Sequence, residues 1–245
     1  MQRIDLNADL GEGIGDDAAM LGLVSSANIA CGGHASDPSL MLASLQLAKA
    51  RGVQIGAHPG YADPANFGRV VVPMEPAVIR AMVAAQIGAL QGVARLCGAK
   101  VAYVKAHGAL ANLAADQRPV ADAIAETAAS AGLGLLAISG TELQAAGEAA
   151  GITTTAEIFA DRAYLATGRL VPRSHPQAMI HDPKAALTRL ISYLDTGLMP
   201  VIDGEPIALQ AQSICIHGDS PEAVQMARVI RAGLAERGIS VASFV

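Results

Sequence analysis

The feature that most constrains the fold of this chain is a recurring order of short apolar runs, polar clusters and helical stretches. The runs have strand length, and we expect strands at Arg3–Ala8, within Leu23–Ala30, and at Val53–Gly56, Val101–Val104, Gly134–Ile138, Thr153–Ile158, Ser213–Ile216 and Ile239–Val245. Strands that alternate with helices indicate parallel βα units. Seven or eight such units in 245 residues predict an α/β protein with a single (β/α) barrel domain over residues 1–245.

Three expected helices begin with an aspartate placed shortly before a proline. Aspartate is a favoured N-cap residue, and proline suits the first helical position because its missing N–H would have no partner there. The pairs Asp37-Pro38 and Asp182-Pro183 have this form, and in Asp219–Glu222 the glutamate can also complete a capping box. A longer, alanine-rich helix is predicted over Glu75–Leu96.

The charge and cysteine content exclude several classes of protein. The formal net charge is −5 and no block of lysine or arginine occurs, so nucleic acids and membranes are not expected as partners. No stretch is expected to approach the length of apolar residues needed to span a bilayer, and the polar amino terminus lacks the features of a signal peptide. The three cysteines include no CxxC pair, which argues against a disulfide framework, and we expect a cytoplasmic protein.

The main structural rival is a dinucleotide-binding sheet, because the glycine-rich segment Gly11–Gly15 follows the first predicted strand. Its glycines miss the GxGxxG spacing, and Glu12 within it would repel a pyrophosphate. The sequence also contains no GxxxxGK[ST] phosphate loop. The sequence therefore predicts neither of these nucleotide sites.

The polar clusters predict a functional site, because the carboxyl ends of parallel strands meet at one face of a barrel. In the first strand Asp5, Asn7 and Asp9 alternate and so share the face that points inward in a small barrel. A buried carboxylate is costly unless it is paired, so these groups need partners. The alternative is a solvated strand end with turn-forming residues.

Histidines recur at equivalent places on this scaffold, and this recurrence is the strongest functional signal. Those that closely follow predicted strands are His34, His58, His107 and His217. Lys105 lies two residues before His107, so both side chains can point to the same side, where lysine neutralises an anion and histidine transfers protons. The remaining two, His175 and His181, lie in a loop and receive no role.

Several other residues have both a functional and a structural interpretation. Arg69 ends a Gly/Pro-rich segment and can make a two-pronged contact with a carboxylate or phosphate, or a surface ion pair. Glu157 and Arg162 belong to interleaved charges that form either a substrate clamp or a salt-bridge network. Cys31 is a candidate nucleophile, although a buried, small apolar role is favoured.

In this order the clusters resemble the LamB/YcsF family, whose pattern includes DLNxDxGE, NIACGxHAGD, GAHPxYxD with FGRR, VKPHGALYN, ExFADRxY with GxLVxR, and IxxHGD. The matching segments are Asp5–Glu12, Asn28–Asp37, Gly56–Arg69, Val104–Asn112, Glu157–Arg173 and Ile216–Asp219, which span almost the whole chain. The departures are Ala8, Ser36, Val70, Ala106 and Ala111. Most leave the polar groups in place, but Ala111 replaces a tyrosine and removes a hydroxyl group.

The resemblance implies a fold similar to the seven-stranded β/α barrel of glycoside hydrolases and deacetylases. Members of the family are known as the A component of an ATP-dependent 5-oxoprolinase. The implied activity is hydrolysis of the lactam of 5-oxo-L-proline to L-glutamate, with ATP and Mg²⁺ used in a complex with subunits B and C.

The resemblance also implies roles for the polar clusters. The implied catalytic residues are Asp9 or Glu12 as a general base, His107 as its acid/base partner, and Lys105, which with Arg69 would hold a carboxylate or phosphate. The segment Gly32–His34 would bind an oxyanion. The full implied set of substrate-binding residues is Asn7, Gly33, His34, His58, Arg69, Glu157, Arg162, His217 and Asp219.

Two alternative functions remain open at this point. One is a metal-dependent amidohydrolase or deacetylase, with His34, His58 and Asp9 as ligands of Zn²⁺ or a similar ion. The spacings match no compact metal motif, however. The other is a non-catalytic binding subunit, but the density of titratable groups at strand ends argues against it. A homo-oligomer is also an open alternative.

Overall fold

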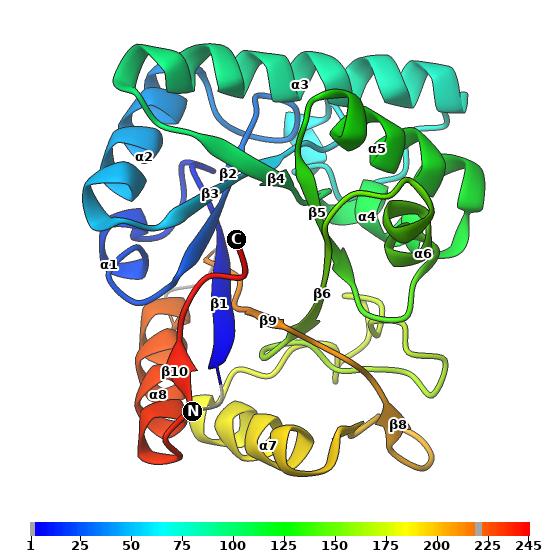
Figure 1. The fold of residues 1–245 in the computed structure, drawn as a ribbon. Coiled ribbons are helices and arrows are strands. Elements are labelled where there is room, and N and C mark those ends of the chain that lie inside the picture. The colour runs from blue at the N-terminus through cyan, green and yellow to red at the C-terminus, as the bar shows by residue number, and fades with distance from the viewer. Residues whose placement is uncertain (1–2, 219–221) are drawn as a thin grey trace.

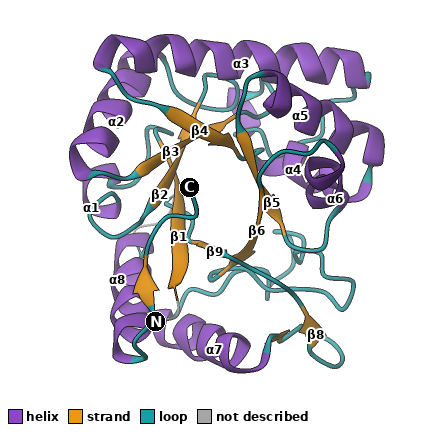
Figure 2. Cartoon of the chain, viewed as in Figure 1, coloured by secondary structure: helices purple, strands orange, loops and turns teal. Residues whose placement is uncertain are grey.

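The computed structural model describes residues 3–218 and 222–245 and contains a closed barrel of parallel strands (Figures 1 and 2). Its strands in sheet order are β1 (Arg3–Leu10), β2 (Ser26–Ala30), β3 (Gln54–His58), β4 (Val101–Val104), β5 (Gly134–Ile138), β6 (Thr154–Phe159) and β9 (Ser213–Cys215). The barrel closes because β1 pairs with β2 on one side and with β9 on the other. The predicted α/β barrel fold is confirmed.

Helices surround the barrel, as Figure 2 shows. They are α1 (Asp17–Met20), α2 (Pro38–Arg51), α3 (Pro76–Cys97), α4 (Gly108–Asp116), α5 (Arg118–Ser130), α6 (Glu142–Ala149), α7 (Pro183–Thr196) and α8 (Ala223–Glu236). Asp37 caps α2 by accepting hydrogen bonds from the backbone N–H groups of the first turn, and Asp182 caps α7 in the same way. The predicted cap at Asp219 lies outside the described residues.

The last apolar run differs from its prediction. Only Ser240–Val241 forms a strand, β10, which pairs with Arg3 and Ile4 at the amino end of β1 and adds no strand to the barrel. The residues that follow cross the opening of the barrel (Figure 1), where Phe244 packs edge-on against Tyr103 with ring centroids 4.9 Å apart. This segment therefore covers the amino end of the barrel. A small antiparallel pair, β7 (Leu198–Met199) and β8 (Ile207–Ala208), lies outside the barrel sheet.

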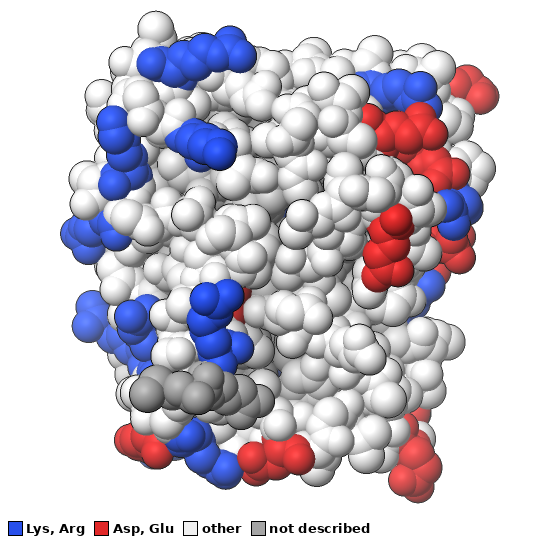
Figure 3. Space-filling model, viewed as in Figure 1, with Lys and Arg blue, Asp and Glu red and all other residues white. Residues whose placement is uncertain are grey.

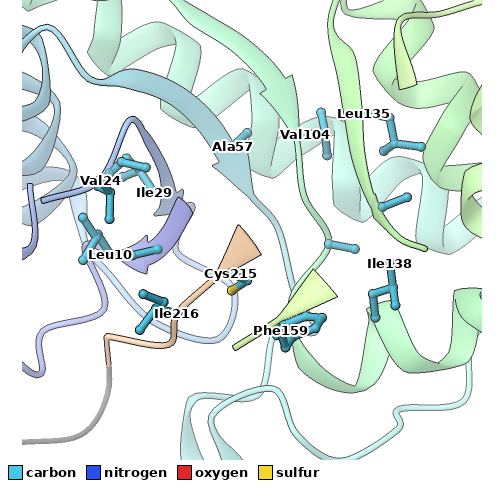
Figure 4. Packing of buried hydrophobic residues seen from close by; sticks show 14 of the residues in the cluster. Leu10, Val24, Ile29, Ala57, Val104, Leu135, Ile138, Phe159, Cys215 and Ile216 are labelled. Atoms are coloured by element: carbon cyan, nitrogen blue, oxygen red, sulfur yellow. The ribbon is translucent and has the colours of Figure 1, made fainter. Parts of the chain in front are cut away.

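The strands separate an apolar layer from a polar barrel interior. Along β1, Leu6, Ala8 and Leu10 belong to the hydrophobic core that packs beneath the helices, while the intervening Asp5 and Asn7 are buried inside the barrel. Figure 4 shows apolar side chains of neighbouring strands in this core. The alternation expected for β1 is therefore present, and it delivers polar groups to the interior.

One glycine makes room for a tyrosine in the barrel interior. A Cβ atom added at Gly56 would collide with the ring of Tyr103. The Tyr103 hydroxyl in turn donates a hydrogen bond of 2.7 Å to the Asn28 side-chain oxygen. Residue 56 therefore has to lack a side chain for the tyrosine to occupy the interior.

Helix α3 corrects one expectation. It has 22 residues, and an 18-residue window within it has a mean hydropathy of 1.4. By length and composition alone it is able to cross a membrane, so the expectation that no stretch approaches this length was wrong. In the structure Ile79, Val83, Ile87 and Leu90 of this helix are buried against the barrel.

The face of the molecule in Figure 3 carries scattered charged side chains, mainly toward its edges.

Candidate active site

The carboxyl ends of the strands open into a pocket of about 460 Å³. This volume lies in the range of pockets for small ligands, roughly 300–1,000 Å³. The predicted site residues that line it are Asp9, His58, Arg69, Lys105, His107, Glu157, Arg162 and His217. Apolar side chains of Leu136, Ile138, Leu143, Leu170 and Val171 form another part of its wall. The pocket is thus both charged and apolar.

Lys105 lies buried between two carboxylates. Its Nζ is 2.9 Å from Asp9 Oδ1 and 3.2 Å from Glu157 Oε2. Burial alone would lower the pKa of Lys105, but the nearby Asp9, Cys215 and Glu157 outweigh it and raise the pKa well above its ordinary value. The lysine is therefore a fixed positive charge at the base of the pocket.

The two carboxylates beside Lys105 respond differently to burial. Burial raises the pKa of Glu157, and the charge of Lys105 only partly offsets this effect. For Asp9 the same burial is overcome by His58 and Lys105, which hold its pKa well below the usual range. Asp9 is therefore the ionised partner of Lys105, and Glu157 is the group that more readily takes up a proton.

A network of amides beneath the pocket orients these charges. Asn7 Nδ2 donates to Glu157 Oε2 at 3.1 Å, and Asn7 Oδ1 accepts from Lys105 Nζ at 3.2 Å. Asn28 Nδ2 donates to Asp9 Oδ1 at 2.8 Å. Asn7 does not line the pocket, so the structure places this predicted substrate-binding residue one layer below it.

Three histidines and a glutamate form a buried cluster on the side of β1, β3 and β4. His34 Nε2 lies 3.0 Å from Glu12 Oε1, and His107 Nδ1 lies 3.0 Å from His58 Nε2. The rings of His34 and His107 stack at 3.6 Å between centroids. One ligand atom from each of the four residues lies within 4.8 Å of the others, so these residues are able to hold a metal ion.

The histidine cluster is unequally exposed to the pocket. His58 and His107 line it, whereas Glu12 and His34 do not. Gly33 does not line it either, and a Cβ atom added there would collide with the Gln86 side chain and the Gly60 carbonyl. The structure thus places part of the predicted substrate-binding set behind the pocket wall.

A further histidine lining the pocket, His217, is held by an aspartate. His217 Nδ1 donates to Asp161 Oδ2 at 2.8 Å, and the ring stacks on Phe159 with centroids 5.3 Å apart. Burial disfavours the Asp161 charge, but His217 outweighs it and lowers the pKa of Asp161. Asp161 was missing from the predicted site, although it directly follows Ala160 in the ExFADR motif, which was its signal.

The arginines at the pocket differ in their exposure and in their contacts. The Arg69 guanidinium lies over the Phe67 ring at 4.9 Å and is exposed at the rim. Arg162 is buried, and its Nη2 group donates to the Val171 carbonyl at 2.7 Å. This hydrogen bond gives the Arg162 guanidinium a structural role. Arg169 and Arg173 also line the pocket and were not predicted as site residues. Arg173 is exposed, so it adds positive charge at the rim.

Three further predictions concern Cys31, Ala111 and Asp219. Cys31 is buried, its Sγ contacts the Ile29 carbonyl at 3.2 Å, and burial raises the pKa of its thiol to about 12. It therefore fits the small apolar role rather than that of a nucleophile. Ala111 lines the pocket, so its missing hydroxyl changes the pocket wall directly. Asp219 lies outside the described residues.

Comparison with known proteins covers the full length of the chain. A protein from Rhodopseudomonas palustris (strain BisA53) that is named as the A subunit of 5-oxoprolinase is 48% identical over 100% of this chain and 99% of its own length. The protein of that name from Nocardia farcinica (strain IFM 10152) is 49% identical over 99% of both chains. The crystal structure of a lactam utilization protein from Thermus thermophilus superposes with a TM-score of 0.92 at 39% identity, covering 99% of this chain and 100% of that chain.

More distant structures share the fold alone. A family 4 carbohydrate esterase from Streptomyces lividans matches 100% of this chain and 93% of its own, with a TM-score of 0.54 and 13% identity.

The sequence profile of the LamB/YcsF family matches residues 4–245. The resemblance expected from the sequence motifs is confirmed, and the chain belongs to the LamB/YcsF family.

Proposed function

We propose that this chain is the A component of an ATP-dependent 5-oxoprolinase and that its pocket opens the lactam of 5-oxo-L-proline to give L-glutamate. The names of the full-length relatives support this assignment. The observation that carries it is the pocket at the carboxyl ends of the strands, where Lys105 lies between Asp9 and Glu157 with histidines on two sides. Such sites at the carboxyl face of a barrel are where barrel enzymes perform their chemistry.

The composition of the pocket wall suits a small cyclic amide that carries a carboxylate. The rim arginines Arg69 and Arg173 would attract the substrate carboxylate, since guanidinium groups bind carboxylates in a two-pronged contact. The apolar wall around Leu136 and Leu170 would contact the methylene groups of the ring. These contacts would orient the amide toward Lys105.

The proposed chemistry explains why ATP and other subunits are needed. An unstrained five-membered lactam is a poor electrophile, so water attacks it slowly. Transfer of the γ-phosphoryl group of ATP to the amide oxygen would give a better electrophile and ADP. Water would then add to the activated carbon, and the C–N bond would break to give γ-glutamyl phosphate with a free amino group. A second water would hydrolyse this acyl phosphate to L-glutamate and phosphate. We assign this sequence to the complex with subunits B and C, with Mg²⁺ accompanying ATP.

The residues that line the pocket are proposed to share the ring-opening step. Lys105 would stabilise negative charge on the phosphoryl group or the developing oxyanion, because it is a fixed cation in a buried site. His217 would move protons to and from water and the ring nitrogen. His107, whose ring nitrogens face the Phe67 carbonyl and His58, would hold the shape of the pocket wall. Asp9 stays in the proposed site as the partner of Lys105, and Glu12 is proposed to position His34 and His107.

The test is release of L-glutamate from 5-oxo-L-proline in a mixture of this chain, subunits B and C, ATP and Mg²⁺. We expect release only when all components are present. In the same mixture the His107→Ala variant should lose activity while its circular dichroism spectrum stays that of the wild type. Glutamate release at the wild-type rate by this variant, or no release by the complete mixture, would refute the corresponding assignment.

A further inference from the structure

The hydrogen bonds of two buried histidines fix their protonation pattern. His58 Nδ1 lies 2.8 Å from the Lys105 carbonyl oxygen, and His107 Nε2 lies 2.8 Å from the Phe67 carbonyl oxygen. A carbonyl oxygen only accepts hydrogen bonds, so each of these nitrogens carries the proton of its ring. Whenever these rings are neutral, the other nitrogen of each, His58 Nε2 and His107 Nδ1, therefore presents a lone pair.

These two lone pairs face each other at 3.0 Å inside the protein. Two acceptors at this distance repel each other unless a positively charged species lies between them. Glu12 Oε1 is a third acceptor, 3.6 Å from His107 Nδ1 and 3.0 Å from His34 Nε2. The cluster thus directs lone pairs from several residues toward one point, and that arrangement calls for a cation.

The spacing of these atoms suits a tetrahedral metal ion. Zinc bonds of about 2.0–2.1 Å to nitrogen or oxygen place neighbouring ligand atoms roughly 3.3 Å apart. The contacts of 3.0 and 3.6 Å in the cluster lie on both sides of that value, and one ligand atom from each of the four residues lies within 4.8 Å of the others. Three imidazole nitrogens and one carboxylate oxygen form a donor set that zinc and similar divalent ions prefer.

The surroundings of the cluster have the form found around metal-binding histidines. Such histidines donate their outer N–H group to a backbone carbonyl or carboxylate, which fixes the ring and leaves the inner nitrogen as a ligand. His58 and His107 both do so, His58 from the end of β3 and His107 from the segment between β4 and α4, and they donate to different backbone segments. All four residues of the cluster are buried, which holds their side chains in place.

We propose that Glu12, His34, His58 and His107 bind a divalent transition-metal ion, with Zn²⁺ as the ion that best suits this donor set. The relatives' names mention no metal, and the proposal stands whether or not the chain acts on 5-oxo-L-proline. His58 and His107 line the pocket, so the ion would lie at the pocket wall, within reach of a ligand there. The neighbouring Asp9 carboxylate, 3.5 Å from His58 Nε2, adds negative charge beside it.

The direct test is metal binding by the isolated full-length chain, which needs neither substrate nor partner subunits. The chain is stripped with a chelator, titrated with Co²⁺ and followed by visible absorption, and its Zn²⁺ content is then measured after dialysis. We expect about one ion per chain and the intense visible bands of tetrahedral Co²⁺, which Zn²⁺ bleaches by displacement. No stoichiometric binding by the wild-type chain would overturn the proposal and leave a proton shared between His58 and His107 as the cation.

Variants show whether the ion occupies this cluster. Glu12→Gln keeps the shape of the side chain and removes its charge, so the affinity should fall by at least about 100-fold, since loss of even an outer partner costs 10–100-fold. His34→Ala should have a similar effect. His175→Asn and His181→Asn are the matched controls, because these exposed histidines lie outside the cluster, and they should bind as the wild type does. Wild-type affinity in folded Glu12→Gln, or loss of binding in the controls alone, would contradict the assignment.

Discussion

The two ends of the barrel bury acidic side chains in contrasting ways. At the amino end, Asp5 accepts hydrogen bonds from the hydroxyl groups of Ser25 and Ser26, both at 2.6 Å, and from Ser213. Every one of these partners is a neutral donor aimed at the carboxyl group. This arrangement satisfies a buried polar group locally and leaves little for a ligand to add.

At the carboxyl end, the buried groups are charged or face one another as acceptors. Lys105 lies between Asp9 and Glu157, and His58 and His107 point lone pairs at each other. These charges and lone pairs are available to a ligand that enters the pocket. The Asp5 carboxyl group, in contrast, already has its hydrogen-bond partners. A buried polar residue therefore indicates function when its partners leave a charge or a lone pair directed at open space.

A large loss of activity is expected from a substitution at His217, at the carboxyl end of the barrel. His217→Asn places an amide nitrogen where Nδ1 was, so it keeps the bond to Asp161 and removes only the nitrogen that faces away from Asp161. Glutamate formation should fall by about 10²–10⁴-fold, the usual worth of a proton-transfer group. The thermal midpoint should change little. His217→Gln, which mimics the other nitrogen, is the matched variant, and equal activity of both with the wild type would remove His217 from the site.

A smaller effect is expected at the amino end. Ser26→Ala removes one hydroxyl donor to Asp5 in a fully buried place, and unfolding free energy should fall by about 1–3 kcal/mol. Glutamate formation should stay within about two-fold of the wild type because Ser26 lies below the site. Urea unfolding and the glutamate assay together check this. Loss of activity in the folded variant would mean that the two ends are coupled.

Ser36 tests whether location at the carboxyl end is enough to matter for function. Its φ of 80° lies in the left-handed region, which favours glycine, and the LamB/YcsF pattern has glycine at this position. Ser36→Gly should raise the unfolding free energy by about 1 kcal/mol by relieving this strain. Turnover should not change, because Ser36 does not line the pocket. A destabilised variant in urea unfolding would show that the Ser36 backbone is not strained.

The pH dependence of stability should have opposite signs at Asp5 and Asp161. Burial raises the pKa of Asp5 above the usual 3.8, so the folded chain binds its proton more tightly and this group opposes folding as pH rises above that range. For Asp161 the pKa is lowered below 3.8, where burial is outweighed by His217, so its contribution is present above this range and is lost as pH falls.

Replacing each aspartate by asparagine removes its titration, so the two pH dependences of stability can be measured. Asp161→Asn should cost more unfolding free energy near neutral pH than near about pH 3, and Asp5→Asn should cost less near neutral pH than near about pH 3. Urea unfolding at both pH values measures the difference for each variant. The same sign of pH dependence for both variants would contradict the different environments described for the two aspartates.

Much of this architecture could be predicted because it is local. Strand length, alternation along β1 and the aspartate caps of α2 and α7 follow from neighbouring residues, and the barrel follows from their repetition. The end of the chain could not be predicted in this way. Its apolar residues resemble a strand, but Phe244 is held by Tyr103, which is distant in the sequence.

The sequence indicates which residues belong to the site, but it does not indicate how they are arranged in space. Strand ends indicated Lys105 and the histidines, because the carboxyl ends of parallel strands converge. Depth was not visible in the sequence: His34 and His107 follow strands in the same way, yet only His107 lines the pocket. Asp161 was overlooked because an aspartate beside an arginine also suits a structural ion pair, and its bond to His217 joins distant segments.

The most direct test of the account compares one substitution at each end of the barrel in the complete mixture with ATP and the partner subunits. Lys105→Met removes the fixed charge at the carboxyl end, and Ser26→Ala weakens the amino end. We predict that folded Lys105→Met releases no detectable L-glutamate from 5-oxo-L-proline, while Ser26→Ala, although less stable, releases it at close to the wild-type rate. Wild-type turnover by Lys105→Met would contradict the claim that the carboxyl end of the barrel is the active site.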